Sequence, residues 1–321
     1  MSHHPEFTPL EKEGPVLVLG AAGVDLVGRL QGELRSETSN PAHIRSSFGG
    51  VARNVAENLA RLGQPVTLLT AVGEDPPGAQ LLDQLADAGV DVSAVQTIPG
   101  QSTGAYLAVV NNKGELQFAL DDMRTSSAAI TPAYLEAHSE LFKQASLLFL
   151  DANSAPETIR KAVSLARRAH LPVCADPTST SLAGRMRPYL PRLFMITPNN
   201  SEAGILSDRP VDASKRRQVM DAARYLVGQG VEIVIITLAQ FGVCYATSQT
   251  AGYIPAIRTE IVDPTGAGDA MTAAVLFGLL NEISLDEALR LGVSASALTL
   301  RHPGAVLPDL TLEKLYEGLV I

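Results

Sequence analysis

The chain has few cysteines, few basic residues and no long apolar run, and each shortage excludes a class of protein. Its two cysteines, Cys174 and Cys244, lie in apolar strand-like runs, so we expect buried thiols without a disulfide framework, as in a reducing cytoplasm. No apolar run approaches the roughly 18 to 20 residues of a membrane span. Basic residues are outnumbered 25 to 34, and the net charge of −9 disfavours nucleic acid or an anionic membrane as the main partner.

Two nucleotide-binding motifs are absent or incomplete. The chain has no G-x-x-x-x-G-K-[ST] sequence, which excludes a P-loop enzyme. Gly20, Gly23 and Gly28 are similar to a dinucleotide-binding turn, but no clear helix pattern follows them, so an NAD-binding protein is kept only as an alternative. The histidines outside the polar N-terminal segment show no paired metal spacing, and that segment, residues 1–14, indicates a flexible tail and no signal peptide.

The stretch that organises the sequence is D-P-T-G-A-G-D-A, residues 263–270. It follows a β-like run, Ile257–Val262, and precedes an apolar run, Met271–Leu280, that predicts a helix. Its glycines free the backbone to turn, and the N–H groups at a helix start favour an anion. Asp269 beside such an anion cradle suggests phosphoryl transfer, with the acid accepting a proton from an attacking hydroxyl. The alternative is an ordinary helix start, with Thr265 as its cap and Asp269 as a favourable first-turn acid.

Strand-like and helix-like segments alternate along the rest of the chain. This alternation predicts one α/β domain, residues 15–321, with a mostly parallel sheet covered on both faces. The predicted strands are Val16–Leu19, Pro65–Val72, Leu147–Leu150, Pro172–Ala175, Leu193–Ile196 and Ile233–Thr237. The predicted helices are 51–63, Ala79–Ala88, Ala133–Lys143, Pro156–Arg168, Asp212–Gly228, Ser284–Leu300 and one that starts at Thr311.

Two segments do not fit this alternation. Residues 26–48 are polar and rich in Gly and Ser, which suggests irregular strands standing off the main body. Residues 103–120 contain a hairpin with its turn at Asn112–Gly114. We expect the two segments to form a small β-sheet lid, whose exposed apolar strands favour a homodimer.

Polar side chains follow several of the predicted strands. Because ligands bind at the carboxyl ends of the strands in α/β folds, we expect these side chains to gather at one edge of the sheet. Each alone could be a turn former or a helix cap. Glu202 could hold Mg²⁺ directly or through water, or it could simply favour the start of a helix. The residues concerned are Asp25, Asp151, Asp176, Asn199 with Glu202, and Thr237.

The pair Gly49-Gly50 with Asn54, together with the motif at 263–270, resembles the motifs of the ribokinase-like (PfkB) carbohydrate kinases. The resemblance covers nearly the whole chain from about Gly14. It implies a three-layer α/β/α fold with a mostly parallel central sheet and a small β-sheet lid. It also implies ATP and Mg²⁺ as cofactors, and transfer of the γ-phosphoryl group to a primary hydroxyl.

The resemblance assigns roles position by position. The roles are Asp269 as catalytic base; Gly266, Ala267 and Gly268 as anion hole; Asp25, Gly50 and Asn54 as ligands of sugar hydroxyls; Asn199, Thr237, Gly242 and Thr265 on the nucleotide side; Glu202 near Mg²⁺; and Asp263 in a loop that binds a monovalent cation such as K⁺. Two positions depart from the family pattern. Gly23 stands where members often have Asn, which removes one sugar contact, and Ala239 precedes Gly242 where the nucleotide loop usually has Gly.

Within the family, three segments look most like those of pseudouridine kinases: Ser39–Pro41, Gly49–Asn54 and Asp121–Met123. Ser39, Asn40 and Asp122 could then pair with the edge of the base, the alternative being a solvated lid hairpin. Another sugar kinase of the family, such as a ribokinase or a fructokinase, is the first alternative for the activity. A non-catalytic regulator that binds a sugar or a nucleotide is an alternative of another class, and the intact motif at 263–270 argues against it.

Overall fold

A computed structural model describes residues 7, 8, 10 and 13–319 of the chain. Most of the expected flexible tail, residues 1–14, therefore lies outside the described residues. Phe7, Thr8 and Leu10 of that segment contact the body. The Phe7 ring packs edge-on against Phe194 with 5.9 Å between ring centroids, and the Thr8 N–H donates to Glu232 Oε2 at 2.7 Å.

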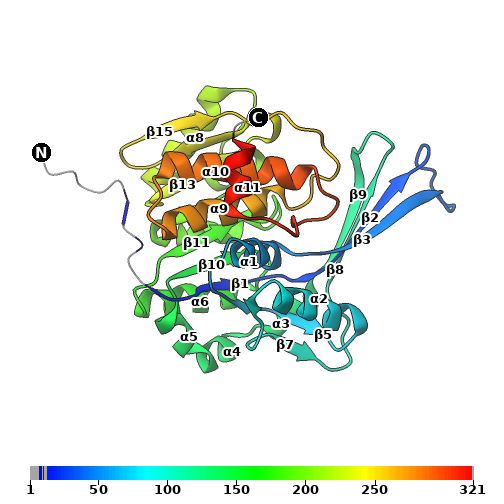
Figure 1. Cartoon of the computed structure of the whole chain (residues 1–321), viewed down its shortest axis with the longest axis horizontal. Coiled ribbons are helices and arrows are strands. Elements are labelled where there is room, and N and C mark those ends of the chain that lie inside the picture. The colour runs from blue at the N-terminus through cyan, green and yellow to red at the C-terminus, as the bar shows by residue number, and fades with distance from the viewer. Residues whose placement is uncertain (1–6, 9, 11–12, 320–321) are drawn as a thin grey trace, which may run out of the picture.

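The body is built around a nine-stranded sheet (Figure 1). Seven neighbouring strands of this sheet, β13, β12, β11, β10, β1, β4 and β6, are parallel to one another. Two further strands, β14 and β15, are antiparallel and form one edge. The central strands are buried along their whole length, as expected for a sheet covered on both faces. Across the sheet the strands are β15 (Ala251–Ile254), β14 (Val243–Ala246), β13 (Ile233–Thr237), β12 (Met195–Ile196), β11 (Val173–Asp176), β10 (Leu147–Asp151), β1 (Val16–Leu19), β4 (Val66–Leu69) and β6 (Val90–Asp91).

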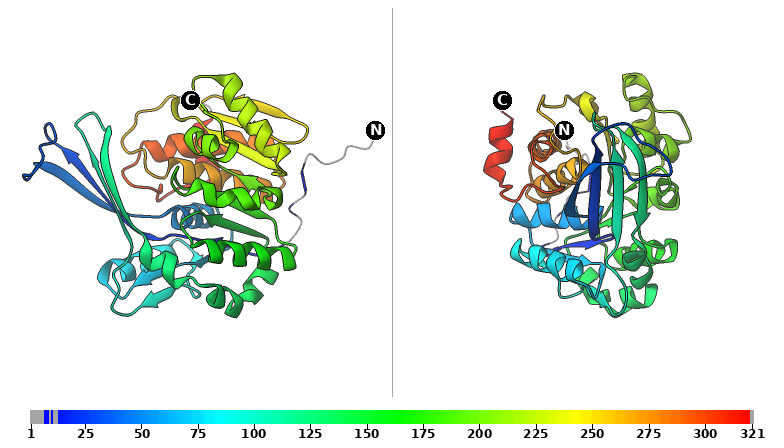
Figure 2. Two further views of the ribbon diagram at one scale, coloured as in Figure 1. Left: turned by 180° about the vertical axis from the view of Figure 1, so that it is seen from behind. Right: turned by 90° about the vertical axis from the view of Figure 1, so that its right-hand side faces the viewer.

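Helices cover both faces of this sheet and complete three layers (Figure 2), so the predicted α/β/α fold is confirmed. One face carries α1 (Val51–Arg61), α2 (Pro76–Asp87), α9 (Ala267–Leu280), α10 (Leu285–Leu300) and α11 (Leu312–Gly318). The other carries α4 (Pro132–Ala137), α5 (Ser139–Gln144), α6 (Pro156–Arg168), the 3₁₀ helix η1 (Ala183–Arg192), α7 (Asn200–Ser207) and α8 (Arg216–Gly228). Within the described part of the chain, no helix is long and apolar enough to cross a bilayer.

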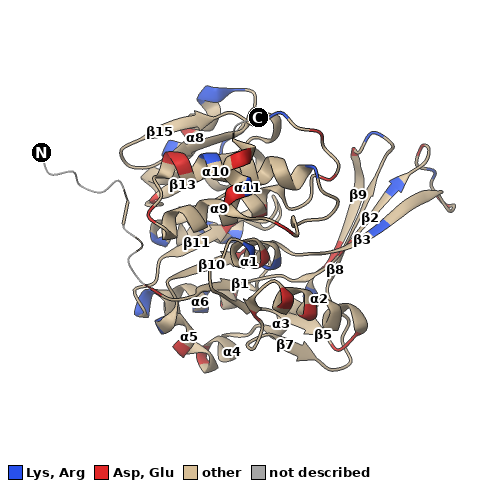
Figure 3. Ribbon diagram, in the orientation of Figure 1, with Lys and Arg blue, Asp and Glu red and all other residues tan. Residues whose placement is uncertain are grey.

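The lid is a separate four-stranded sheet that projects from the body (Figures 1 and 2). Its strands are, in order, β3 (Ala42–Gly49), β2 (Gly23–Leu30), β8 (Ala105–Val110) and β9 (Leu116–Asp122). At its base, α3 (Arg124–Ala129) follows β9, and β5 (Ala71–Gly73) pairs with β7 (Gln96–Ile98). Basic residues lie on the outer parts of β2 and β3, and acidic residues lie where β9 meets the body (Figure 3).

Three predicted elements differ from the structure. The strand predicted at 257–262 is wrong: the segment is a loop held on the end of α10, where the Val262 N–H donates to Leu300 O at 2.8 Å. The strand predicted at 65–72 breaks at Thr70, whose hydroxyl donates to the Gly20 carbonyl at 2.7 Å. The helix predicted at 133–143 breaks at His138, which leaves helical geometry with φ −101° and ψ 19°.

Candidate active site

The start of α9 forms an anion cradle. Gly266 adopts φ 76°, in the left-handed region, and a Cβ there would overlap the Ala305 carbonyl, so only glycine fits the turn. The first N–H groups of the helix have no intrahelical partners, and they favour an anion. At Gly268 an added Cβ would meet no atom within 4 Å, so the cradle has room for a ligand group. Asp269 lies in this first turn.

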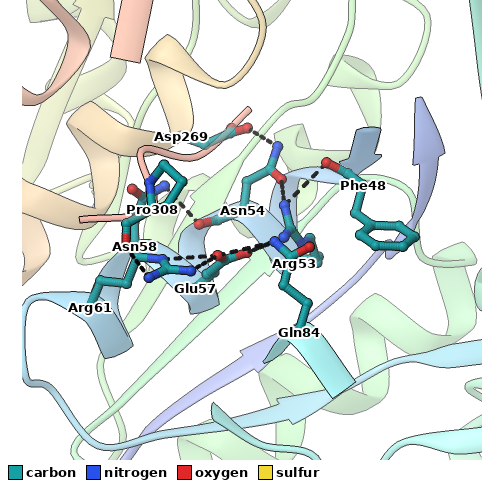
Figure 4. A network of polar contacts seen from close by, with 9 residues as sticks. All are labelled: Phe48, Arg53, Asn54, Glu57, Asn58, Arg61, Gln84, Asp269 and Pro308. Atoms are coloured by element: carbon teal, nitrogen blue, oxygen red, sulfur yellow. Dashed lines mark hydrogen bonds and ion pairs between the residues drawn. The ribbon is translucent and has the colours of Figure 1, made fainter. Parts of the chain in front are cut away.

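The start of α1 forms the opposite side of the site. Gly50 precedes the helix with φ 97°, and a Cβ there would overlap the Ala21 carbonyl. Asn54, on the first turn, is only 3% exposed. Its Nδ2 donates to Asp269 Oδ2 at 2.7 Å (Figure 4). The segment Gly49–Asn54 and the motif at 263–270, which are far apart in the sequence, therefore meet at this hydrogen bond.

The Asp269 carboxylate lies in a crowded, acidic surrounding. Burial raises the pKa of Asp269 to about 7. The hydrogen bond from Asn54 opposes this rise, the nearby Asp151 and Asp25 add to it, and the positive charge of Arg53 opposes it. A carboxylate with a pKa near neutrality is suited to accept a proton at pH 7.

Asp151, at the end of β10, is a fully buried carboxylate that holds the site together. Its Oδ2 accepts the N–H groups of Ala21 at 2.9 Å and of Ala52 at 3.1 Å, and its Oδ1 accepts that of Asn153 at 2.9 Å. Burial raises the pKa of Asp151, while these three backbone donors lower it. Asp151 thus ties the end of β1 to the start of α1.

Asp25 belongs to a row of polar side chains that crosses the lid. On β2 it pairs with Ser47 of β3 and with Tyr106 of β8, and Tyr106 pairs with Asp121 of β9. Residues directly opposite one another in a sheet place their side chains on the same face, so these four form one continuous row. We call it the acceptor row.

The acceptor row faces the body of the protein. Burial raises the pKa of Asp25 to about 6; Arg53 of α1 lowers it, and Asp263, in the motif before α9, raises it. Burial also raises the pKa of Tyr106, and the charges of Asp25 and Asp121 add to that rise. The charge of Asp25 in turn raises the pKa of Asp269, so the acceptor row and Asp269 influence one another electrostatically.

The three residues predicted to read a base do not join this row. Asp122 follows Asp121 in β9, so it points to the opposite face, where it pairs with the exposed Arg124 at 2.6 Å. Ser39 and Asn40 lie in the exposed loop between β2 and β3, at the tip of the lid. There Asn40 Nδ2 donates to Arg35 O at 2.9 Å, and Asn40 Oδ1 accepts the Arg35 N–H at 2.8 Å. The structure does not bring these three residues to Asp269.

Three of the predicted nucleotide-side residues, Asn199, Thr237 and Gly242, lie near the ends of β12 and β13, and the fourth, Thr265, precedes Gly266. Asn199 caps α7, and its Oδ1 accepts the Glu202 N–H at 2.9 Å. The Glu202 carboxylate in turn accepts Asn199 N–H at 2.9 Å and Nδ2 at 2.7 Å, so the two residues form a capping box at the start of α7. Thr237 is bridged to Asn199 across the strand ends. Gly242, with φ 89°, closes the short turn η2 (Ala239–Phe241) that follows β13.

A further acid, Asp176 at the end of β11, lies near Glu202. Burial holds the pKa of Asp176 well above its usual range, and the charges of Glu202 and Asp269 raise it further. Among the described residues, no group of three or more His, Cys, Asp or Glu side chains is arranged to hold a metal ion.

Asp263 closes the turn that leads to Gly266. Its Oδ1 accepts the Thr265 N–H at 3.0 Å, and its Oδ2 accepts the Gly304 N–H at 3.2 Å. Both carboxylate oxygens are thus engaged by backbone donors. The side chain ties the motif to the loop after α10.

Reasoning from the sequence missed Arg53, Ser47, Tyr106 and Asp121. The alternation of side chains along β9 distinguishes Asp121 from Asp122 once the register is known. The sequence does contain a pattern that indicates an ion pair of Arg53, because an acid, Glu57, stands four residues later on the same predicted helix.

The fold and the site define a class of protein: an α/β phosphotransferase with an anion cradle and a carboxylate facing a lid. The chain belongs to the pfkB family of carbohydrate kinases, whose family model matches residues 15–312. Members of this family are ATP-dependent kinases of sugars and nucleosides, and the chain is an enzyme of that kind.

Known relatives cover the chain almost from end to end. It is 34% identical over 298 residues to a pseudouridine kinase from Escherichia coli, and the match covers 92% of this chain and 94% of that protein. It is 29% identical over 284 residues to a guanosine-inosine kinase from Exiguobacterium acetylicum, spanning 88% and 93%. The fold matches that of Arabidopsis thaliana ribokinase complexed with ribose and ATP, with a TM-score of 0.84 at 21% identity over 96% of this chain and 99% of that one.

Proposed function

We propose that the chain transfers the γ-phosphoryl group of ATP to the 5′-hydroxyl of pseudouridine, giving pseudouridine 5′-phosphate and ADP. The contact between Asn54 and Asp269 carries this proposal, because it sets an amide that can hold a sugar hydroxyl against a carboxylate that can take a proton. The likeness to a pseudouridine kinase over nearly the whole chain supports the choice of acceptor.

Asp269 acts as the base. Its carboxylate takes the proton of the 5′-hydroxyl while that oxygen forms a bond to the γ-phosphorus. The bond from the γ-phosphorus to the β–γ bridging oxygen breaks, and ADP leaves with the electron pair. The N–H groups of Gly266, Ala267 and Gly268 stabilise the negative charge on the transferring group.

The acceptor lies between the lid and α1. The Asp25 carboxylate accepts hydrogen bonds from sugar hydroxyls, the backbone of Gly50 lies alongside the sugar, and Asn54 donates from Nδ2. The base of the nucleoside lies along the acceptor row. There Tyr106 and Asp121 offer a donor and acceptors to its N–H and carbonyl groups.

The nucleotide lies at the ends of β12 and β13, against Asn199, Thr237, Gly242 and the backbone of Thr265. Mg²⁺, when bound with the nucleotide, neutralises charge on its β- and γ-phosphates. Glu202, whose carboxylate oxygens each accept a hydrogen bond from Asn199, would hold this ion through water. The carbonyl groups of the loop around Asp263 would hold a monovalent cation, K⁺, and we therefore expect a higher rate in potassium than in choline buffer.

The activity depends on the ionisation of Asp269. Its pKa is raised to about 7, so the base is protonated and inactive below that pH. The rate of phosphoryl transfer therefore rises as pH increases through about 7. A pH profile of kcat/KM for pseudouridine, measured with saturating ATP, reports this value for the free enzyme.

We also propose a cytoplasmic homodimer formed through the lid. Side chains on the face opposite the acceptor row line an apolar groove of about 270 Å³. The groove includes Leu26, Ile44, Leu107 and Phe118, and Ile44 is 74% exposed. The occupant is a second copy of the chain, because the same exposed apolar strands on two lids are self-complementary about a two-fold axis.

An acceptor panel tests the function. Pseudouridine, uridine, guanosine, inosine, ribose and fructose are each offered with ATP and Mg²⁺, and ADP release is followed. We expect the highest kcat/KM with pseudouridine. Turnover of ribose or guanosine with no turnover of pseudouridine would assign the chain to another kinase of the family. Loss of turnover for every acceptor would instead favour a non-catalytic binding protein.

A further inference from the structure

Arg53, next to Asn54 in α1, is a buried cation that the reaction described above does not use. Its Nη1 donates to Phe48 O at 3.1 Å and to Asn54 Oδ1 at 2.9 Å, and its Nη2 forms an ion pair with Glu57 (Figure 4). The guanidinium is therefore fixed at one end by the end of β3 and at the other by an acid one turn along its own helix.

These contacts select one orientation of the Asn54 amide. With Oδ1 held by the donating guanidinium, Nδ2 must face the other way, and there it donates to Asp269 Oδ2 at 2.7 Å. The flipped amide would set an NH₂ donor against the Arg53 donors and a carbonyl oxygen against the carboxylate. Both contacts would then be repulsive.

We propose that Arg53 is a positioning residue for the catalytic base: it fixes the Asn54 amide, and through it the Asp269 carboxylate, while its charge faces both Asp25 and Asp269. The inference rests on the proposed function, in which Asp269 is the base.

The charges around Asp269 make the role of Arg53 measurable. Asp269 is faced by Asp25 of β2, by Asp151 of β10 and by Asp176 of β11, all of them acids. From α1 it is faced by the neutral Asn54 and by the positive charge of Arg53. Arg53 itself faces Glu57, Arg61 and Asp25. Removing its charge leaves Asp269 among acids, which raises the pKa of the base.

Arg53 has partners that could also suggest a purely structural role. Glu57 is bound by Arg61 Nε at 2.9 Å and by Gln84 Nε2 at 3.2 Å, and Arg61 donates to the Pro308 carbonyl. This chain of contacts holds α1 against α2 and the loop after α10. A role in folding alone predicts a lower rate with an unmoved pH profile in every variant of Arg53, whereas the charge of Arg53 beside Asp269 predicts a moved pH profile in a variant that lacks the charge.

The test compares Arg53→Met, Arg53→Lys and, as a matched control, Arg290→Met, which removes an exposed arginine paired with Asp286 on α10. The pH profile of kcat/KM is measured for pseudouridine, or for the acceptor that the native enzyme turns over fastest. Arg53→Met should move the acidic limb up by about one pH unit. The rate at pH 7 should then fall about fivefold and recover towards pH 9.

Arg53→Lys keeps the charge but cannot bridge Asn54 and Glu57 together. Its acidic limb should stay near the native position while kcat falls at every pH. Arg290→Met should match the native enzyme in both respects. An unmoved limb in Arg53→Met, or equal shifts in the Met and Lys variants, would overturn the inference and leave the proposed function standing. An inactive native enzyme would overturn both.

Arg53→Met could lose its fold, since it leaves Glu57 with one cation fewer. The double variant Arg53→Met with Glu57→Gln removes both buried charges, an exchange that is often neutral for stability. It should show the same upward shift of the acidic limb. A well-folded double variant with the native profile would also overturn the inference.

Discussion

The side-chain amide of Asn54 donates a 2.7 Å hydrogen bond to the Asp269 carboxylate and so joins the start of α1 to the start of α9. Each helix start is set by a turn at a glycine with positive φ, Gly50 for α1 and Gly266 for α9. Asn54 and Asp269 are therefore aligned by the backbone geometry of the two helix starts.

Asp269→Asn should be inactive and yet more stable than the native enzyme above neutral pH. Phosphoryl transfer should fall at least about 100-fold, because the base is lost. The folded-state pKa of about 7 lies above the ordinary 3.8, so the native fold loses stability as pH rises from 3.8 to 7, and this cost is complete above pH 7 and absent below 3.8. The free energy of unfolding at pH 8 should rise by about 1–3 kcal/mol.

Urea unfolding of both proteins at pH 8 and pH 4.5 checks this prediction. The gain should be present at pH 8 and largely absent at pH 4.5. Asp286→Asn, which removes an exposed acid of α10, should change stability little at either pH. A less stable Asp269→Asn at pH 8 would contradict the assigned pKa.

Asp121→Asn and Asp122→Asn form a matched pair at neighbouring positions of β9. Asp121 lies in the acceptor row and Asp122 on the opposite face, so only the first should weaken acceptor binding. We expect the KM for pseudouridine to rise about tenfold in Asp121→Asn, and to stay within about twofold of the native value in Asp122→Asn. The KM for ATP should not change in either. Equal effects of the two variants would refute the acceptor row.

Ala239→Gly should stabilise the nucleotide loop. Ala239 has φ 49°, a left-handed conformation that favours glycine, at the position where the family pattern usually has Gly. We expect the free energy of unfolding to rise by about 0.5–1 kcal/mol. Ala222→Gly, in the interior of α8, is the control and should lower it, because that residue is helical. A loss of stability in Ala239→Gly would show that its methyl group packs usefully.

Ile44→Glu should convert the proposed dimer to a monomer. Ile44 lies in the apolar groove of the lid, and a charge there would be buried against the second copy. Arg45→Ala, one residue further along β3 and on the other face, should leave the dimer intact. Light scattering after size-exclusion chromatography distinguishes the two. A monomeric native protein across the micromolar range would contradict the proposed assembly.

The layers of the fold and the place of the motif could be predicted from the sequence because their signals are local. Alternating apolar runs identify strands and helices, and Gly266 with Asp269 identifies a helix start near an anion. The strand predicted at 257–262 failed for the opposite reason. Its apolar residues are typical of a strand, but a tertiary contact with the end of α10 holds the segment as a loop.

The direction of the lid side chains could not be predicted. Asp121 and Asp122 are chemically equivalent in the sequence, and only the register of β9 on β8, which shifts between Val109 and Val110, decides which one faces Asp25. Asn40 lies in a motif that predicts a contact with a ligand, and the sequence does not show that its amide also closes a loop with Arg35.

Helix α1 buries an unusual set of side chains for a core helix, with Arg53, Asn54, Glu57 and Asn58 all nearly inaccessible to solvent. Apolar helices tolerate small errors of docking, because one hydrophobic contact replaces another. A rotation or a one-turn slip of α1 would instead bury unpaired charges and amides, at a cost of several kcal/mol. The network that aligns the site therefore also makes the fold specific. A state in which α1 docks wrongly, and in which Asp269 would be misaligned, is less stable than the native state.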